Sequence, residues 1–593
     1  MPERKRRVLV IPAGGSGNGV GHLARCIRLS RNAGGKVTFL TTRMDAEARS
    51  FLQRELLRFP ARLRPAVINR AAPGGLWDIV LVDARSTTRA DLEAVAGHGP
   101  VVCVDEGGEA REFASFTVDA LPGLPGRSEA NLSSPAFLDL PSRMRKKVGW
   151  PVRKVLLTFG GEDRANLSGR LLASLSREGL FSPQQVTVVE GPLFHVHDWP
   201  QGIEVVKSPA DLSDKLPGYD LVFTHFGNTA FEALAAGVPV VLLSPTRYHD
   251  SLGATCGFPR VGIGHPDAGA LRRVLRDAAG LRALVDGFNV SLGKDRVNRL
   301  APLVATLRPR GSPLCPLCGS GGNRVMARFP DRTYRRCRHC GIVYLESFAA
   351  EPMSYGRTYF SSEYRAQYGR TYLEDFDAIK TASRPRVRLV RELTAKGVDG
   401  VVVDIGCAYG PFLDALKEEG VPGYGVDVSS AAVAYVRKNL GIPALCGSFE
   451  DARRADLPRR ISAVTLWYVV EHFVDTDLVL RKASSLLPPG GVLAFSTPNG
   501  AGISARKDTR EFLRNSPADH FTVFSPRVLR DILLEYGLAL RRIRVTGHHP
   551  ERFPGVIGGA ARRWRFAFRL VAAVSRLMRL GDTFEAYAVK ERQ

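Results

Sequence analysis

An apolar segment that meets a glycine-rich turn is the stretch of this chain best suited to hold a cofactor. The segment is VVVDIGCAYGPF (401–412), which contains Asp404, and a second apolar segment, GYGVDV, places Asp427 twenty-three residues further on. Such a strand–turn–helix lets the backbone approach a nucleotide-like ligand, and the second acid can bind both ribose hydroxyls. The chain has no GK[ST] sequence to cradle phosphates. We therefore expect a nucleoside-type cofactor here.

The spacing of this turn, DxGCxxG, resembles motif I of class I S-adenosylmethionine (SAM) methyltransferases. The resemblance implies a Rossmann-like α/β domain whose third strand, LCGS, leads to a ring that stacks on adenine and an acid that binds its amine. The last two strands, LALRRIRVTG and FEAYAVKE, are expected to form the reversed edge hairpin of that fold. The implied SAM-binding residues are Asp404, Gly406, Cys407, Gly410, Asp427, Phe449 and Glu450.

Two histidines are candidate bases for methyl transfer. His472 follows the fourth strand, in VVEHF, at the carboxyl edge of the sheet, where ligands bind. His520 lies in PADHFTVFSP (517–526). A sulfonium is already a strong electrophile, so the protein has to align the acceptor and, for a hydroxyl, remove a proton. The alternative for His520 is a packing or capping role.

Four cysteines have the spacing of a structural zinc site. Two CxxC pairs are separated by eighteen residues, and a glycine follows each pair (Gly319 and Gly341), as in a tight knuckle turn. Zinc is favoured over an iron–sulfur cluster by this spacing. The nine cysteines of the chain do not resemble a secreted disulfide framework. The predicted ligands are Cys315, Cys318, Cys337 and Cys340.

The combination of CPLCGS, CRHCG, TYFSSEYRAQYGRTYLEDF, VVDIGCAYG and VVEHF resembles zinc-ribbon methyltransferases of sugar and cell-envelope pathways. The resemblance covers residues 312–593, and DHxxxFS matches an element near the acceptor pocket of such enzymes. It implies a sugar-containing acceptor, with zinc in a structural role and SAM as the methyl donor.

The front of the chain carries a second possible centre. GGSGNGVGHLARCIRLSR places His22 and Arg25 in the first turn of a helix, where an anion is favoured and a histidine can accept a proton. HFGNTAFEALAAGVPVV places Gly227, Asn228 and Thr229 between a strand and a helix with Glu232, where amides can hold a diphosphate. The alternative for His22 is a hydrogen bond at the helix start.

GVGHLARCIRLS, VDEGG, FGGEDRAN and GNTAFEALAAGVP are similar to the UDP-sugar hydrolase of the pseudaminic acid pathway, a GT-B-fold family. The similarity covers about residues 6–300 and implies that His22 helps water attack the anomeric carbon. A glycosyltransferase needs the same nucleotide site, so that alternative stays open. The implied nucleotide-sugar-binding residues are Gly21, Arg25, Gly227, Asn228, Thr229 and Glu232.

Alternating apolar runs and helical patterns position these groups. They predict an α/β chain with two Rossmann-like lobes, a small cysteine unit and a third α/β series. The resemblances imply that these parts are a GT-B-like pair of lobes, a zinc ribbon and a class I methyltransferase domain. A length of 593 residues accommodates roughly three to four domains of ~150 residues. The expected boundaries are 1–145 and 146–310 for the lobes, 311–346 for the ribbon and 347–593 for the methyltransferase.

The net charge of +24 indicates an anionic partner or an arginine-rich proteome. Residues 560–580 read as one basic amphipathic helix that either docks on an anionic membrane or covers the methyltransferase core. The N-terminus does not resemble a signal peptide, and no apolar run approaches the ~20 residues of a membrane span. We therefore expect a cytoplasmic protein, with a peripheral location at the inner face of the membrane as the alternative.

These features favour a bifunctional enzyme of surface-glycan assembly, with nucleotide-sugar chemistry in front and sugar methylation behind. A nucleic-acid methyltransferase is the rival, but LWYVVEHF stands where an [ND]PP[FY] motif is common, and no basic patch is interleaved with aromatic residues. Nucleic acid is thus not the expected partner. A third hypothesis makes the front half a non-catalytic module that binds a sugar nucleotide.

Overall fold

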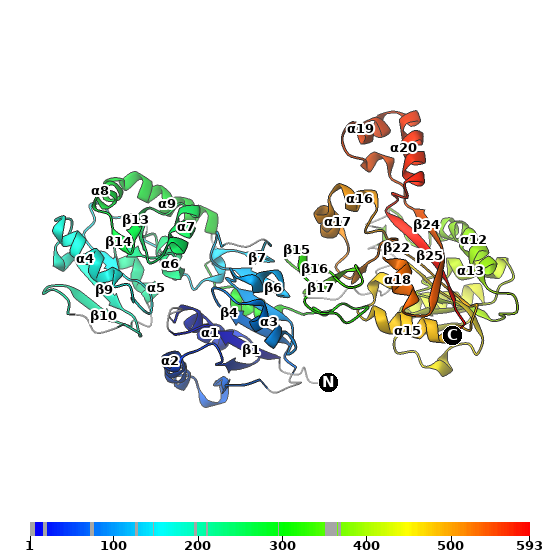
Figure 1. The fold of residues 1–593 in the computed structure, drawn as a ribbon, viewed down its shortest axis with the longest axis horizontal. Coiled ribbons are helices and arrows are strands. Elements are labelled where there is room, and N and C mark those ends of the chain that lie inside the picture. Colours follow the sequence, from blue (N-terminus) through cyan, green and yellow to red (C-terminus); the bar gives the residue numbers. More distant parts are fainter. Residues whose placement is uncertain are drawn as a thin grey trace. The chain divides into compact units, whose positions relative to one another are not determined.

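The computed structural model describes residues 6–15, 20–71, 76–124, 128–145, 147–194, 198–208, 212–293, 296–349, 364–365 and 369–592. The chain forms two compact units, Met1–Leu307 and Arg308–Gln593, here called the N-terminal unit and the C-terminal unit (Figure 1). Each is an assembly of sheets and helices of its own.

The first sheet of the N-terminal unit is parallel and has the order β3-β2-β1-β4-β5-β6-β7. Its central strands are continuous apolar runs, as expected for a sheet covered on both faces. The strands are β1 (Arg7–Pro12), β2 (Lys36–Leu40), β3 (Ala66–Ile68), β4 (Ile79–Asp83), β5 (Val101–Val104), β6 (Phe116–Asp119) and β7 (Leu132–Ser133). The α-helices are α1 (Gly21–Asn32), α2 (Ala46–Leu57) and α3 (Arg89–Ala96).

The second sheet repeats this plan in the order β10-β9-β8-β11-β12-β13-β14, with β14 antiparallel. Its strands are β8 (Val155–Leu157), β9 (Val186–Glu190), β10 (Glu204–Lys207), β11 (Leu221–Thr224), β12 (Val240–Ser244), β13 (Arg260–Ile263) and β14 (His265–Pro266). Its helices are α4 (Leu167–Arg177), α5 (Leu212–Lys215), α6 (Asn228–Ala235), α7 (Arg247–Thr255), α8 (Ala268–Arg276) and α9 (Ala278–Leu292). The strand order reverses at β1/β4 and at β8/β11, and ligands of such sheets bind at these points. Helix α10 (Leu300–Thr306) returns to α1.

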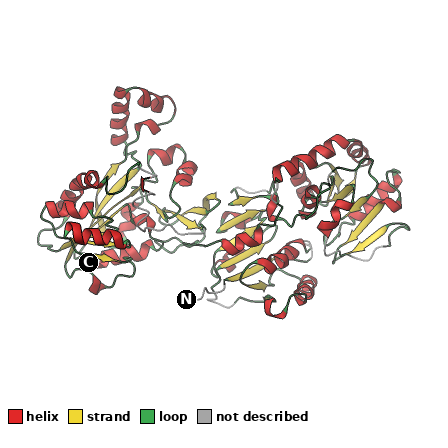
Figure 2. Ribbon diagram, turned by 180° about the vertical axis from the view of Figure 1, so that it is seen from behind, coloured by secondary structure: helices red, strands yellow, loops and turns green. Residues whose placement is uncertain are grey.

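The large sheet of the C-terminal unit has the order β20-β19-β18-β21-β22-β25-β24. Strand β25 is antiparallel to both neighbours, which confirms the expected reversed hairpin. Val402 and Val403 enter different hydrophobic cores, so the sheet is covered on both faces, as the helices in Figure 2 indicate. The strands are β18 (Val401–Ile405), β19 (Gly423–Asp427), β20 (Ala444–Cys446), β21 (Ile461–Trp467), β22 (Val492–Pro498), β24 (Leu538–Thr546) and β25 (Thr583–Lys590). The helices are α12 (Phe376–Leu393), α13 (Pro411–Glu418), α14 (Ser430–Tyr435), α15 (Thr476–Leu486), α16 (Ile503–Lys507), α17 (Thr509–Asn515) and α18 (Leu529–Leu534).

The cysteine-bearing segment builds a small antiparallel sheet in the order β15-β16-β17-β23. Its first three strands are β15 (Val325–Phe329), β16 (Arg332–Arg336) and β17 (Val343–Ser347). The fourth, β23 (Thr522–Val523), comes from the segment that follows β22 and α17 of the large sheet's chain. Cys315, Cys337 and Tyr344 share a hydrophobic core with Phe495 and Phe524, so the small sheet and the large sheet pack as one body.

Two helices connect β24 to β25, α19 (Gly555–Arg563) and α20 (Arg565–Leu577). The single basic helix expected over residues 560–580 is therefore wrong, because the backbone turns extended at Trp564. Within the described residues, no helix is long and apolar enough to span a bilayer.

Candidate functional site

Asp404 on β18 supports the glycine-rich turn that follows this strand. Its carboxylate is buried and accepts a 2.6 Å hydrogen bond from Thr465 Oγ1 on the neighbouring strand β21. Burial raises the pKa of Asp404 to about 7. The side chain thus ties two central strands together beneath the turn.

The turn glycines are required by the protein's own packing. Gly406 has φ +67°, and a Cβ there would lie 2.4 Å from Val469 Cγ2. Gly410 has φ +82°, and its Cβ would lie 2.8 Å from Leu440 Cδ1. Both glycines were expected to allow close ligand approach, whereas neighbouring side chains and a positive φ already require them.

Cys407 was expected to contact SAM, but the structure gives it a packing role. Its side chain is buried in a hydrophobic core, and a Cβ on Gly425 of β19 would lie 2.7 Å from its Sγ. The thiol therefore packs the turn against β19 and does not face a cofactor.

Asp427 ends β19 and braces the turn. Its Oδ2 accepts a 2.8 Å hydrogen bond from the Ala408 amide, and its Oδ1 accepts one of 2.8 Å from the Ser429 amide. Burial raises the pKa of Asp427. Each carboxylate oxygen has a second lone pair, so the group can still accept two ribose hydroxyls. These acceptor positions thus fit the two ribose hydroxyls of SAM.

The adenine end differs from the expectation. Phe449 is buried in the core, with Lys482 Nζ 5.0 Å from its ring centroid, so its ring is not available to stack on adenine. Glu450 is half-buried and accepts a 2.9 Å hydrogen bond from Ser448 Oγ.

Tyrosines gather beside the turn instead. The rings of Tyr372 and Tyr409 lie 6.0 Å apart, and those of Tyr409 and Tyr435 lie 5.2 Å apart. Burial is the main cause that raises the pKa of Tyr372, and the charges of Asp404 and Asp427 add to it. The sequence signal was the segment TYFSSEYRAQYGRTYLEDF, of which residues 358–363 and 366–368 lie outside the described residues.

Four polar side chains converge after β21: Glu471, His472, Asp519 and His520. His472 Nδ1 lies 3.1 Å from Asp519 Oδ2, and the two imidazole rings meet edge to face with centroids 4.6 Å apart. Glu471 is 1% exposed. A proton on His472 Nδ1 would be donated to Asp519 and would leave Nε2 as the proton acceptor.

The two histidines differ in protonation. Burial lowers the pKa of His472, but the hydrogen bond to Asp519 and the charge of Glu471 outweigh it, so the net shift is upward. Burial, followed by the charge of His472, lowers the pKa of His520 to about 3. Burial raises the pKa of Glu471 to about 7. Of the two candidate bases, His472 is thus the one that a carboxylate orients, whereas His520 is governed by burial.

The small sheet positions this cluster. The Leu345 amide of β17 donates a 2.9 Å hydrogen bond to the Phe521 carbonyl, next to His520. Val343 of β17 pairs with Val523 of β23. The segment that carries Asp519 and His520 is therefore an edge of the cysteine-bearing sheet.

The four predicted cysteine ligands come together. Their sulfur atoms all lie within 4.8 Å of one another, and the pairs Cys315/Cys340 and Cys318/Cys337 have Sγ–Sγ distances of 3.6 Å. Zn–S bonds of ≈ 2.3 Å in a tetrahedron place sulfurs about 3.8 Å apart, so the thiols fit the metal. Gly319 and Gly341 have φ of +67° and +76°, as the knuckle turns require.

A cavity of about 450 Å³ lies in the N-terminal unit, at the switch points of its two sheets. Five residues of the expected site line it: Gly21, His22, Gly227, Asn228 and Thr229. Asn228 begins α6, so the start of this helix lines the cavity. Residues 16–19 of the glycine loop lie outside the described residues.

His22 is held by a buried ionic network. Its Nδ1 lies 2.7 Å from Asp83 Oδ1, at the end of β4. Arg25 binds Asp83 at 2.7 Å and Asp105 at 2.5 Å. Burial opposes ionisation of Asp83, but the charges of Arg25 and His22 outweigh it and lower its pKa.

Two residues that were expected to bind the nucleotide, Arg25 and Glu232, are buried away from the cavity. Arg25 is 2% exposed and neutralises Asp83 and Asp105, so it is not available to the nucleotide. Glu232 does not line the cavity, and its burial raises its pKa to about 7. Both side chains belong to the interior.

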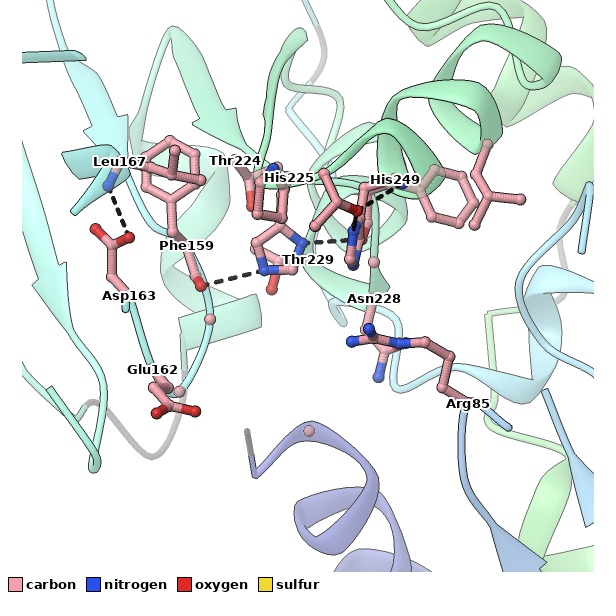
Figure 3. Close-up of a pocket in the computed structure, with 18 of the residues that line it drawn as sticks. Arg85, Phe159, Glu162, Asp163, Leu167, Thr224, His225, Asn228, Thr229 and His249 are labelled. Carbon is pink, nitrogen blue, oxygen red and sulfur yellow. Dashed lines mark hydrogen bonds between the residues drawn. The ribbon is translucent and has the colours of Figure 1, made fainter. Parts of the chain in front are cut away.

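Three cavity residues were missed by sequence reasoning: Arg85, His225 and His249. Figure 3 shows Arg85 extending toward Asn228 at the start of α6. His225 is fixed between the carbonyls of Phe226 (2.9 Å) and Phe159 (3.1 Å), and burial lowers its pKa. Burial, with smaller contributions from His225 and Arg85, lowers the pKa of His249 to about 3. Arg85 thus shares the cavity with two imidazoles, His225 and His249, whose lowered pKa values favour the neutral form.

Comparison with known proteins agrees with the C-terminal fold. Residues 378–543 match the family model of a methyltransferase domain. Ubiquinone biosynthesis O-methyltransferases are similar: that of Stutzerimonas stutzeri is 31% identical over 102 residues (16% of this chain, 44% of the relative). That of Chromobacterium violaceum is 25% identical over 160 residues, 25% of this chain and 68% of the relative. That of Bradyrhizobium diazoefficiens is 33% identical over 124 residues, 20% of this chain and 47% of the relative.

The chain thus spans about half the length of the first and third of these relatives. Among solved structures, a SAM-dependent methyltransferase from Archaeoglobus fulgidus is 17% identical, covering 38% of this chain and 98% of its own, with a TM-score of 0.28. The family match and the sheet order agree, so the C-terminal unit contains a class I SAM-dependent methyltransferase domain.

Proposed function

We propose that the C-terminal unit methylates a hydroxyl of a sugar-containing acceptor, with His472 as the general base. The observation that carries the proposal is the 3.1 Å contact between His472 and Asp519 beyond the carboxyl end of β21. Relatives named O-methyltransferases support oxygen as the acceptor atom. The resemblance to zinc-ribbon methyltransferases supports a sugar.

Each residue then has a defined task. SAM supplies an activated methyl group. Asp427 and the turn after β18 hold the ribose, with Gly406 and Gly410 shaping the backbone. His472 Nε2 takes the acceptor proton as the oxygen–carbon bond forms and the carbon–sulfur bond breaks. Asp519 stabilises the imidazolium that results.

His472→Ala tests the assignment. We expect kcat for methyl transfer to fall by ~10²–10⁴-fold, the usual contribution of a general base. SAM affinity, measured by calorimetry, should be unchanged. His520→Ala is the matched control, and its effect on kcat should be smaller. A variant His472→Ala with native kcat on every acceptor tested would refute the proposal.

We also propose that the four cysteines hold one structural zinc ion. Sulfur distances of 3.6 Å and two glycine knuckles support a closed tetrahedral site. Metal analysis of the purified protein should give about one zinc per chain. Iron, or no metal, would contradict this assignment.

For the N-terminal unit we propose a nucleotide-sugar site that hydrolyses or transfers the sugar. The supporting observation is His22, held by Asp83 at the edge of the cavity, opposite the start of α6. With Nδ1 donating to Asp83, Nε2 can accept a proton from water or an acceptor hydroxyl. Arg85 is suited to the diphosphate because guanidinium binds phosphate oxygens in pairs.

UDP release from a panel of UDP-sugars tests this site. His22→Ala should slow release by ~10²–10⁴-fold and leave UDP binding intact. His265→Ala, an exposed histidine on β14, is the control. Tight UDP binding without release from any sugar nucleotide would favour the non-catalytic binding module instead.

A further inference from the structure

The connection between β24 and β25 exposes bulky apolar side chains. Val556 is 88% exposed, Phe566 79% and Leu577 85%. These residues lie on α19 and α20, which Figure 1 draws in red. Six further bulky side chains of this connection are exposed: Ile557, Trp564, Phe568, Leu570, Val574 and Met578. An apolar area of this kind marks an interaction surface.

Small residues hold the two helices in place. The buried positions of the helices are Gly558, Ala561, Ala572 and Ser575. Ser575 Oγ lies 2.8 Å from His548 Nδ1, and Arg552 pairs with Asp582 at 2.8 Å. None of the large apolar side chains of residues 555–579 enters the hydrophobic cores found among the described residues. This observation counts against the alternative in which the segment covers the methyltransferase core.

The charge of the segment indicates an anionic partner. Residues 552–581 contain seven arginines and no aspartate or glutamate. Among them, Arg562, Arg565 and Arg569 are exposed on the same two helices as the apolar side chains. Cationic side chains beside Trp, Phe and Leu are the composition of helices that lie in a bilayer interface. Anionic headgroups attract the arginines while the apolar residues enter the acyl boundary.

Two other occupants fit less well. A second copy of the chain would bring seven arginines against seven arginines in a two-fold interface. Nucleic acid would leave the aliphatic side chains Val556, Leu570 and Leu577 without a matching surface, since bases stack on aromatic rings.

We propose that α19 and α20 form a docking surface for anionic lipid membranes. Phe566 and Leu577 insert between lipids, and the arginines bind headgroup phosphates. The docking is independent of the proposed chemistry, because no residue of α19 or α20 belongs to the SAM turn or to the His472 cluster.

Vesicle flotation of the full chain tests the proposal. Vesicles of phosphatidylcholine with about one third phosphatidylglycerol should bind the protein, and pure phosphatidylcholine should bind it at least ~10-fold less. Phe566→Ser/Leu577→Ser should lower binding by ~10-fold or more, because the inserted area is lost. Arg565→Gln/Arg569→Gln should lower binding and flatten its dependence on salt.

Matched controls replace exposed residues of the same kind elsewhere. Leu63→Ser/Val290→Ser controls for loss of apolar surface, and Arg276→Gln/Arg282→Gln controls for loss of charge. SAM affinity, equal in all variants, shows that the methyltransferase domain is folded. The proposal is overturned if the native protein does not bind anionic vesicles or if the variants on α20 bind as the controls do. It is also overturned if those variants abolish a dimer seen in solution without lipid.

Discussion

His472 and His520 are neighbouring imidazoles whose protonation is set by different surroundings. His472 has a carboxylate at 3.1 Å, whereas burial dominates at His520. The charged form of His472 is stabilised, so its pKa is raised, and His520 stays neutral. In the proposed mechanism only the neutral form of His472 accepts a proton, so we expect its raised pKa to set the lower limit of the active pH range.

Asp519→Asn tests this coupling. The variant removes the carboxylate that raises the pKa of His472, so the acid limb of the kcat–pH profile should move to lower pH. At pH above that limb, kcat should also fall, because an amide does not stabilise the imidazolium. The profile of His520→Ala should keep the native acid limb. An unmoved limb in Asp519→Asn would assign the titration to another group.

Asp427→Ala tests the cofactor contact. Leaving ribose hydroxyls unpaired costs about 1–3 kcal/mol, which weakens SAM binding by roughly 5- to 150-fold. The Ala408 and Ser429 amides lose their acceptor as well, so the turn should loosen. Asp451→Ala, an exposed acid after β20, is the control for calorimetry. Unchanged affinity would place the ribose elsewhere.

Local sequence predicted the residues that touch a turn but not their distant partners. His22 and Asp83 are 61 residues apart, and His472 and Asp519 are 47 apart. A spacing pattern records which residues follow a strand, whereas such pairs depend on which strands become neighbours. For the same reason Phe449, placed at the adenine by its motif, turned out to be a core residue.

The edge strand β23 connects the cysteine-bearing sheet to the segment that carries Asp519 and His520. It contains two residues and pairs with β17. Its last residue, Val523, lies four residues after Asp519. A two-residue strand has no periodicity, so the sequence did not predict it. The longer strands were predictable because they are apolar runs closed by acids or glycines. The break at Trp564 was not, because the helical pattern of residues continues across it.

Cys318→Ser tests this coupling at the level of the element. Loss of the metal should release β17 and, with it, the segment of Asp519 and His520. A displacement of about 1 Å at a catalytic group costs roughly 10²-fold in rate. SAM affinity should change less, because Asp427 lies on another strand. Zinc content and kcat are measured together, with Cys256→Ser as the control. A zinc-free variant with native kcat would show that the cysteine cluster does not position the segment of Asp519 and His520.

At the scale of the molecule, the two compact units each have their own cores. Thermal unfolding should therefore show two transitions. SAM at about 100 times its Kd should stabilise the C-terminal unit by ~2.7 kcal/mol and leave the other transition in place. UDP should raise the other transition alone. Differential scanning calorimetry measures both transitions. A single transition that either ligand raises would show that the two units do not unfold independently.

Strand β25 imposes an order on synthesis. It lies between β22 and β24, so the large sheet stays open at β22 until residues 583–590 leave the ribosome. The N-terminal unit, complete by Leu307, can fold long before then. During that interval β22 has an unpaired edge of the kind that chaperones shield. Stalled chains that end before Thr583 should therefore bind chaperones through the methyltransferase region, while the front of the same chain is already protease-resistant.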